Sequence, residues 1–138
     1  MKKLLLLSAL LIFACSYGQD EETVPVYPGC KIKTSNSEKR KCMSSAISEF
    51  VVRKFDTDIA KYLGLSGRQR ISVIFKIDKK GYVKDIRIRA PHPRLEKEAA
   101  RVINMLPRMT PGTVNGQPVV VPYSLPITFQ VAPSAATK

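Results

Sequence analysis

The sequence has no tryptophan, one histidine and three cysteines, and acidic residues are scarce, with 11 Asp and Glu against 23 Lys and Arg. The single histidine, His92, stands between two prolines and has no nearby carboxylate or nucleophile in the sequence. General acid–base catalysis needs a positioned partner group, and a zinc site needs about four ligands. A glycine-rich phosphate loop is also missing. We therefore expect a protein that is not an enzyme and that holds no metal or other cofactor.

Long apolar runs are missing too, apart from a short one at the amino terminus. Two lysines precede an apolar segment over residues 4–14, which is shorter than the ~20 residues needed to span a bilayer. This pattern is typical of a secretory signal peptide, and small residues at Ser16 and Gly18 predict cleavage after Gly18. In the alternative route, a lipoprotein signal ends before Cys15, which is then lipidated. Both routes predict export to the periplasm or cell envelope, the second with a lipid anchor in the membrane.

The rest of the chain has the length of one domain. We expect a signal peptide over residues 1–18, a single domain over residues 19–132 and a flexible tail over residues 133–138. Cys30 and Cys42 remain in the domain, and an even pair in an oxidising compartment predicts a disulfide.

The excess of positive charge favours nucleic acid, anionic lipid or acidic proteins as partners. Export argues against nucleic acid. The sequence also has no basic stripe interleaved with aromatic residues, which is the pattern of proteins that bind single-stranded RNA or DNA. An envelope partner is therefore expected, and a basic face that is merely solvated is the alternative.

Apolar periodicity predicts two helical regions. Apolar residues recur at spacings of three and four over residues 43–63, and residues 56–58 are expected to bend or divide this region. The polar segment 30–41 is expected to be a surface loop closed by the disulfide. A second helix is expected from Pro93 to the residue before Pro107, with two glutamates near its positive end.

Alternation of apolar and polar residues predicts a β-hairpin in the middle of the chain. Residues 70–77 place apolar side chains on one face, although Ile74 interrupts the polar face. Residues 78–81 are a tight-turn sequence that ends in glycine. We expect an unbroken alternation over residues 82–89, in which Ile86 and Ile88 mark the inner face. The basic outer face of the hairpin would consist of Arg70, Lys76, Arg87 and Arg89.

The last strand is expected over residues 119–131, and its prolines predict where it lies. Pro122 and Pro126 have the same parity, so both missing N–H groups fall on one lateral side of the strand. That side cannot pair as an interior ladder, so the strand should form an edge of the sheet. A right-handed crossover then pairs it antiparallel with the first strand. The expected fold class is α+β, with a three-stranded antiparallel sheet in the order 2-1-3 and helices packed on one face.

Several motifs, in order and spacing, resemble the C-terminal domain of TonB energy transducers. They are VPVYPGC at residues 24–30, RISVIFKID at 70–78, GYV at 81–83, LPRMTPG at 106–112 and PITF at 126–129. The resemblance extends over residues 24–131. It implies a helix-packed, three-stranded antiparallel sheet. It also implies a domain that binds an outer-membrane TonB-dependent receptor through an extended receptor segment, which adds a strand to the sheet.

Carried onto this chain, the resemblance makes the last strand the recognition edge. The apolar segment at the amino terminus is shorter than a transducer's membrane helix, and no Pro-rich linker follows it. We therefore expect a periplasmic domain accessory to TonB-dependent transport, bound to such a receptor or a related envelope protein. The alternative is a structural or dimerising envelope protein, a homodimer that keeps the fold without energy transduction. The expected partner-binding residues are Val119, Val120, Val121, Tyr123, Ser124 and Leu125.

Overall fold

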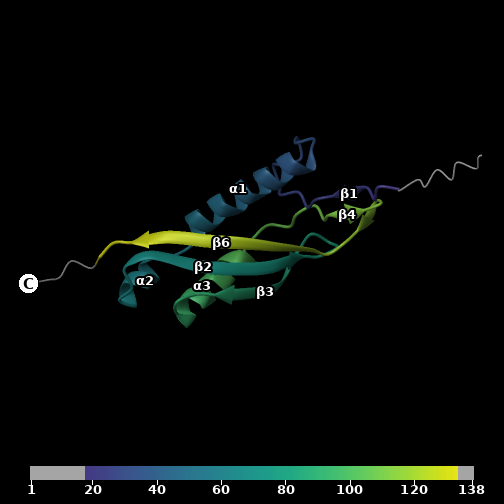
Figure 1. Cartoon of the computed structure of the whole chain (residues 1–138). Helices are drawn as coiled ribbons and strands as arrows, with labels where there is room; N and C mark the ends of the chain where they lie inside the picture. Colours follow the sequence, from purple (N-terminus) through teal and green to yellow (C-terminus); the bar gives the residue numbers. More distant parts are fainter. Residues whose placement is uncertain (1–17, 134–138) are drawn as a thin grey trace, which may run out of the picture.

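The computed structural model describes residues 18–133 of the chain (Figure 1). Residues 1–17 and 134–138 lie outside the described residues, and with them Cys15 and nearly all of the expected signal peptide and tail. Two three-stranded antiparallel sheets and three helices make up the described part, which confirms the α+β class. Of these helices, none combines the length and the apolar character that a bilayer-spanning segment needs.

The main sheet consists of β2 (Gly67–Ile77), β3 (Val83–Arg89) and β6 (Val121–Val131). The strand order is β3-β2-β6, and both pairs are antiparallel. β6 runs beside β2 along its whole length (Figure 1). β6 is therefore an edge strand, which is the position that its prolines predict.

The hairpin formed by β2 and β3 contains a bulge. Ile74 and Lys76 are two residues apart on β2, whereas their partners Arg87 and Lys84 are three residues apart on β3. Asp85 lies in this irregularity with a φ of 50°. The expected unbroken alternation over residues 82–89 is therefore wrong, because one extra residue in a strand shifts the faces of those beyond it. The β3 residues that pack against the core are Val83, Ile86 and Ile88.

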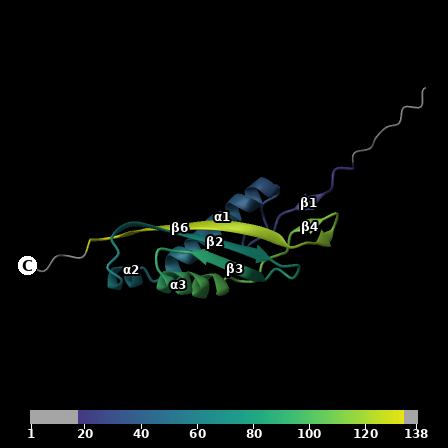
Figure 2. The same cartoon turned by 60° about the horizontal axis from the view of Figure 1, so that its bottom comes forward.

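A second, small sheet was not expected from the sequence. It consists of β1 (Glu22–Thr23), β4 (Thr113–Val114) and β5 (Gln117–Pro118), in the order β1-β4-β5. Asn115 and Gly116, both with positive φ, form the turn between β4 and β5. The small sheet lies at one end of the main sheet, and α2 (Asp58–Tyr62) lies at the other (Figures 1 and 2).

The small sheet also shortens the last strand relative to the expectation. β5 ends at Pro118, and the N–H of Val119 donates to the carbonyl of Gly112 over 2.9 Å. Residues 119 and 120 therefore connect the two sheets, and the strand begins at Val121 rather than Val119.

The first helical region is divided as expected, into α1 (Asn36–Lys54) and α2. The expectation of a loop over residues 30–41 is wrong from Asn36 onward. Ser35 caps α1, since its hydroxyl accepts from the N–H of Glu38 (3.2 Å), whose carboxylate accepts from the N–H of Ser35 (3.3 Å). This capping box starts the helix in a polar segment that has no apolar stripe.

α3 (Pro93–Asn104) begins where the sequence predicted, with Pro93 in its first turn. His92 is the N-cap, and its Nδ1 atom accepts from the N–H of Arg94 over 3.1 Å. The lone histidine therefore has a structural role at the start of a helix.

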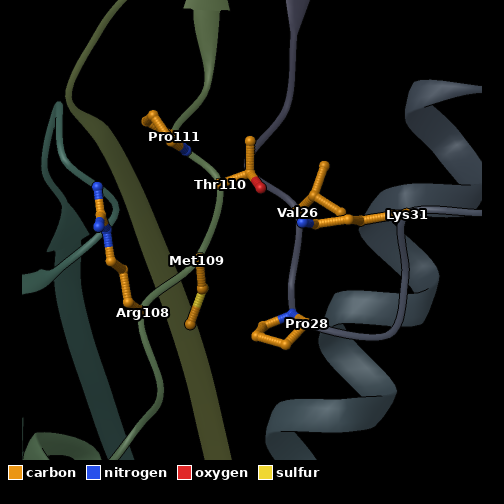
Figure 3. Close-up of a pocket in the computed structure, with 7 residues that line it drawn as sticks. All are labelled: Val26, Pro28, Lys31, Arg108, Met109, Thr110 and Pro111. Atoms are coloured by element: carbon orange, nitrogen blue, oxygen red, sulfur yellow. The ribbon is translucent and has the colours of Figure 1, made fainter.

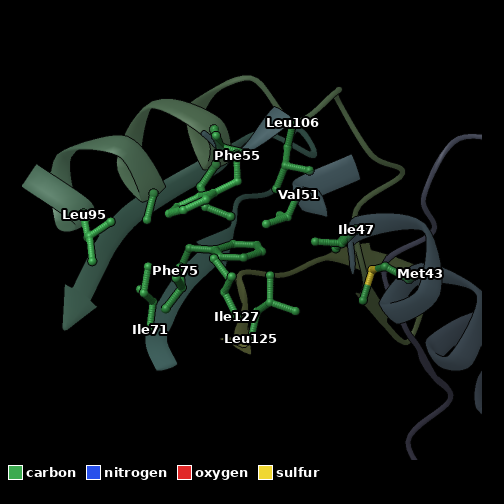
Figure 4. Packing of buried hydrophobic residues seen from close by; sticks show 14 of the residues in the cluster. Met43, Ile47, Val51, Phe55, Ile71, Phe75, Leu95, Leu106, Leu125 and Ile127 are labelled. Atoms are coloured by element: carbon green, nitrogen blue, oxygen red, sulfur yellow. The ribbon is translucent and has the colours of Figure 1, made fainter. Parts of the chain in front are cut away.

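The core lies between the helices and one face of the main sheet (Figure 4). The buried side chains of β2 all have one parity, so the other face of that strand is exposed. The core residues labelled in Figure 4 are Met43, Ile47, Val51, Phe55, Ile71, Phe75, Leu95, Leu106, Leu125 and Ile127.

Glu98 joins the two helical regions. It is 8% exposed, and its carboxylate accepts from Arg101 Nε (2.8 Å) and from the N–H of Asp56 (3.0 Å). Arg101 in turn donates to the carbonyl of Lys54 over 2.9 Å. The ion pair therefore fastens the junction of α1 and α2 to α3, a tertiary role beyond the helix-dipole contact that the sequence predicts.

We expect Glu98→Gln to lower the free energy of unfolding by about 2 kcal/mol at neutral pH, because charged hydrogen bonds are lost. The hydrogen bonds from Arg101 hold the pKa of Glu98 below its ordinary value of 4.5. A lowered native pKa contributes stability above the unfolded-state value, and this contribution is lost as the pH falls through the native value. The difference in unfolding free energy between the two proteins, measured by urea unfolding, should therefore be smaller at strongly acidic pH than at neutral pH.

The matched control is Glu49→Gln, which removes a carboxylate from an exposed position on α1. Its unfolding free energy should stay close to that of the unmodified protein. If Glu98→Gln lowers the unfolding free energy equally at both pH values, the role assigned to the charge of Glu98 is contradicted.

Candidate functional site

The outer edge of β6 has no strand paired to it within residues 18–133. Backbone groups of successive residues in an antiparallel strand point to alternate sides. Pro122 and Pro126 have no N–H to offer to β2, so their parity is the outward one. Between residues 122 and 128, the outward carbonyls belong to both prolines and to Ser124 and Thr128. The outward N–H groups belong to Ser124 and Thr128 alone, so this edge has twice as many acceptors as donors.

A groove lies between this edge and α1. One hollow of about 250 Å³ is lined on the strand side by residues 121–123, and a second of about 220 Å³ by residues 125–128. The α1 residues that line the two hollows include a stripe at intervals of four, which places them along one side of the helix. This groove-facing stripe is Arg40, Ser44, Ser48 and Val52.

Tyr123 stands between the two hollows. Its hydroxyl and that of Ser44 are hydrogen-bonded, 2.7 Å apart, and so connect β6 to α1. Its ring packs against Phe75, with 5.3 Å between the ring centroids. Tyr123 therefore divides the groove into two compartments. The second compartment has a largely uncovered apolar residue at its border, Val52, which is 78% exposed.

The N-terminal segment forms the remaining wall of the first compartment, with residues 22–25 in its lining. The predicted disulfide between Cys30 and Cys42 is present and ties this segment to α1. Asn36 Nδ2 also donates to the carbonyl of Glu22 over 2.6 Å. The wall is thus held by a covalent link and a hydrogen bond to the same helix.

A further hollow, of about 300 Å³, lies between the N-terminal segment and the loop over residues 108–111 (Figure 3). It contains two cations, Lys31 and Arg108, which lie on opposite sides in the close-up. Arg108 Nε donates to the carbonyl of Lys80 over 2.7 Å, and the guanidinium lies 5.2 Å from the ring centre of Tyr82. Because Arg108 is engaged by Lys80 and Tyr82 and lies on the other side of the hollow from Lys31, the two cations do not form a joint anion site.

Within the described part of the chain, no three His, Cys, Asp or Glu residues gather in a way that would hold a metal ion. Tyr27 and Glu38 have shifted pKa values and do not line the groove. Burial raises the pKa of Tyr27, and hydrogen bonds from Ser35 lower that of Glu38.

The expected partner-binding residues fall into three groups. Val121 and Tyr123 line the first compartment, and Leu125 lines the second. Ser124 lies on the outward edge. Val119 and Val120 precede the strand, so they are not part of its ladder.

Sequence reasoning missed the α1 side of the groove and Thr128. The groove-facing stripe contains one arginine and two serines beside Val52, so it carries no apolar signal. Thr128 has the same outward parity as Ser124, and the proline argument would have included it had it been followed to the end of the strand.

These features define a small α+β domain with one helix-covered sheet face and an open edge strand beside a groove. The family described as Gram-negative bacterial TonB protein C-terminal matches residues 58–131, more than half of the chain, and the chain belongs to this family. The match begins at Asp58, so α1 and the motif at residues 24–30 lie outside it. No curated protein matches the chain.

We expect the double variant Cys30→Ser/Cys42→Ser to lower the free energy of unfolding by about 3 kcal/mol, because the closed loop no longer restricts the unfolded chain. Denaturant unfolding of the variant and of the oxidised protein measures the loss. Treatment of the unmodified protein with a thiol reductant serves as the control and should give a similar loss. Unfolding curves that coincide for all three samples would show that this link does not stabilise the domain.

Proposed function

We propose that this chain is a non-catalytic, periplasmic TonB-like domain that binds an extended segment of an outer-membrane TonB-dependent receptor. In this proposal the segment adds a strand to β6, and the domain is accessory to TonB-dependent transport. The observation that carries the proposal is the unpaired β6 edge beside a groove. Membership of the TonB C-terminal family supports the class of partner. Residues 1–18 would be removed on export, or lipidation of Cys15 would anchor the domain to a membrane.

The backbone of the edge favours this mode of binding. An added strand would donate to the outward carbonyls of β6 and accept from the N–H groups of Ser124 and Thr128. It would leave its own carbonyls unpaired opposite Pro122 and Pro126. These two unpaired carbonyls weaken the added pairing, which keeps the hydrogen bonds made at the other outward groups of β6.

The groove adds a side-chain requirement. Alternate side chains of an added strand point to the same face, so every second residue would enter the groove beside α1. Two compartments separated by Tyr123 suit two apolar side chains with a gap between them. We therefore expect the preferred segment to have apolar residues in alternating positions.

We expect Ser124→Pro/Thr128→Pro to weaken binding by at least about tenfold, because two N–H donors of the edge are lost at roughly 1 kcal/mol each. Both residues face outward, so the ladder with β2 keeps its hydrogen bonds. Synthetic peptides from the periplasm-facing N-terminal segments of the host's TonB-dependent receptors are titrated while amide NMR shifts are followed.

The matched control is Ser124→Ala/Thr128→Ala, which changes the same side chains and keeps both N–H groups. Its affinity should stay within about threefold of the unmodified protein. If the proline variant is folded and binds like the alanine variant, strand addition at β6 is excluded. Peptide-independent shifts that grow with protein concentration would instead indicate that the edge pairs with a second copy of the chain.

We also expect Val52→Lys to weaken peptide binding by about fivefold, because part of an apolar contact of roughly 1 kcal/mol is replaced by a charge. Val52 is exposed, so the fold should tolerate the change. Ile32→Lys is the control, since Ile32 is 83% exposed and does not line the groove. Equal affinities for the two variants would place the peptide away from α1.

A further inference from the structure

The face of the main sheet opposite the helices carries a dense set of cations. Residues directly opposite each other in neighbouring strands share a face. Lys84 lies opposite Lys76, Arg87 opposite Ile74 and Arg89 opposite Ser72, and all of these residues are exposed. Arg68 and Arg70 have the same parity on β2. We call this set the basic face: Arg68, Arg70, Lys76, Lys84, Arg87 and Arg89.

Little negative charge compensates the basic face. Asp85 pairs with Lys76 over 3.3 Å. Within residues 18–133, the four arginines of the face take part in no ion pair. Like charges directly opposite each other in neighbouring strands are destabilising, and Lys76 and Lys84 form such a pair. An anionic partner would relieve this repulsion and would supply counter-charges for the arginines.

The geometry of the face suits phosphate groups. A hollow of about 510 Å³ is lined by Arg87 and Arg89 together with Ser72, Ile74, Ile88 and one carboxylate, Glu96. Glu96 is engaged by the N–H of Ala90 (3.2 Å). Ile74 is 50% exposed and gives the centre of the face an apolar contact. The planar guanidinium group matches phosphate oxygens with two parallel hydrogen bonds, which a lysine cannot do.

We propose that the basic face binds an anionic phospholipid surface, with the arginines at the lipid phosphates. The position of the arginines favours lipid over an acidic flank of a docked peptide. Arg87 and Arg89 are on β3, about 10 Å across the sheet from β6. The β6 residues whose backbone groups point to the open edge between positions 122 and 128 are all uncharged.

The spread of charge also favours lipid over a folded acidic protein. A folded acidic protein that covered this face would have to desolvate its charges, and each charge left without a matched partner would cost free energy. The cations cover most of the exposed face of β2 and β3. Lipid phosphates, by contrast, contact such cations at a hydrated surface. A domain lying on a membrane through this face would keep the lateral edge of β6 free.

The test uses the purified protein carrying Cys15→Ser, so that no acyl chain tethers it. It is sedimented with phosphatidylcholine vesicles, with or without about one-third phosphatidylglycerol. We expect binding to the anionic vesicles only. Each cation near such a surface contributes about fivefold in binding, so Arg87→Gln/Arg89→Gln should weaken it by at least about tenfold. Binding should also fall steeply with salt, because the charges are exposed.

The matched control is Lys33→Gln/Lys41→Gln, which removes two exposed charges away from the basic face. Its vesicle binding should change by no more than about threefold. Arg68→Gln/Arg70→Gln is a second variant of the face, and its vesicle binding should fall in the same way. It replaces the β3 variant as the test if NMR spectra show that the β3 variant is misfolded. If the control and the face variants lose vesicle binding to the same extent, net charge alone explains the binding, and the proposal is overturned. Failure to bind anionic vesicles would overturn it too, and salt-sensitive binding to an acidic receptor peptide would then assign the face to protein.

Discussion

Two missing N–H groups constrain the whole main sheet. Pro122 and Pro126 cannot donate to a neighbour on their side, so β6 pairs with β2 through its other side and lies at the edge. Within residues 18–133, no strand therefore pairs with the outer side of β6, and a lateral surface stays open beside α1. Three features depend on this position of β6. They are the groove, the uncharged edge of the sheet, and the distance between that edge and the arginines of β3.

The groove is built from two parts of the chain with different origins in the family comparison. β6 lies within the residues that match the TonB C-terminal family, whereas α1 and the N-terminal segment precede them. The disulfide and the Tyr123–Ser44 hydrogen bond fasten these preceding residues to the matched part. The backbone edge thus lies within the residues that match the family, and the α1 wall of the groove lies outside them.

The sequence predicts those parts of the fold that follow from periodicity or from a missing chemical group. The alternation in β2, the stripe of α3 and the parity of the prolines are of this kind. The bulge at Asp85 was missed because it depends on one residue adopting a positive φ, and the start of α1 because a capping box leaves no apolar period. The small sheet and the tertiary contacts of Glu98 join residues far apart in sequence, which local patterns do not reveal. For the candidate site, parity predicts the backbone edge, but the α1 side is polar and is visible only once the helix lies beside β6.

The pairing of β6 has a mechanical consequence. β6 is hydrogen-bonded to β2 along its whole length, with full pairing on that side, while its outer side lacks donors at both prolines. A strand held on the outer side and pulled along its own axis would load all its hydrogen bonds in shear at once, and these are fewer than those between β6 and β2. If a strand adds to this edge as proposed, tension along it would therefore remove that strand before β6 leaves the sheet, and the domain would stay folded.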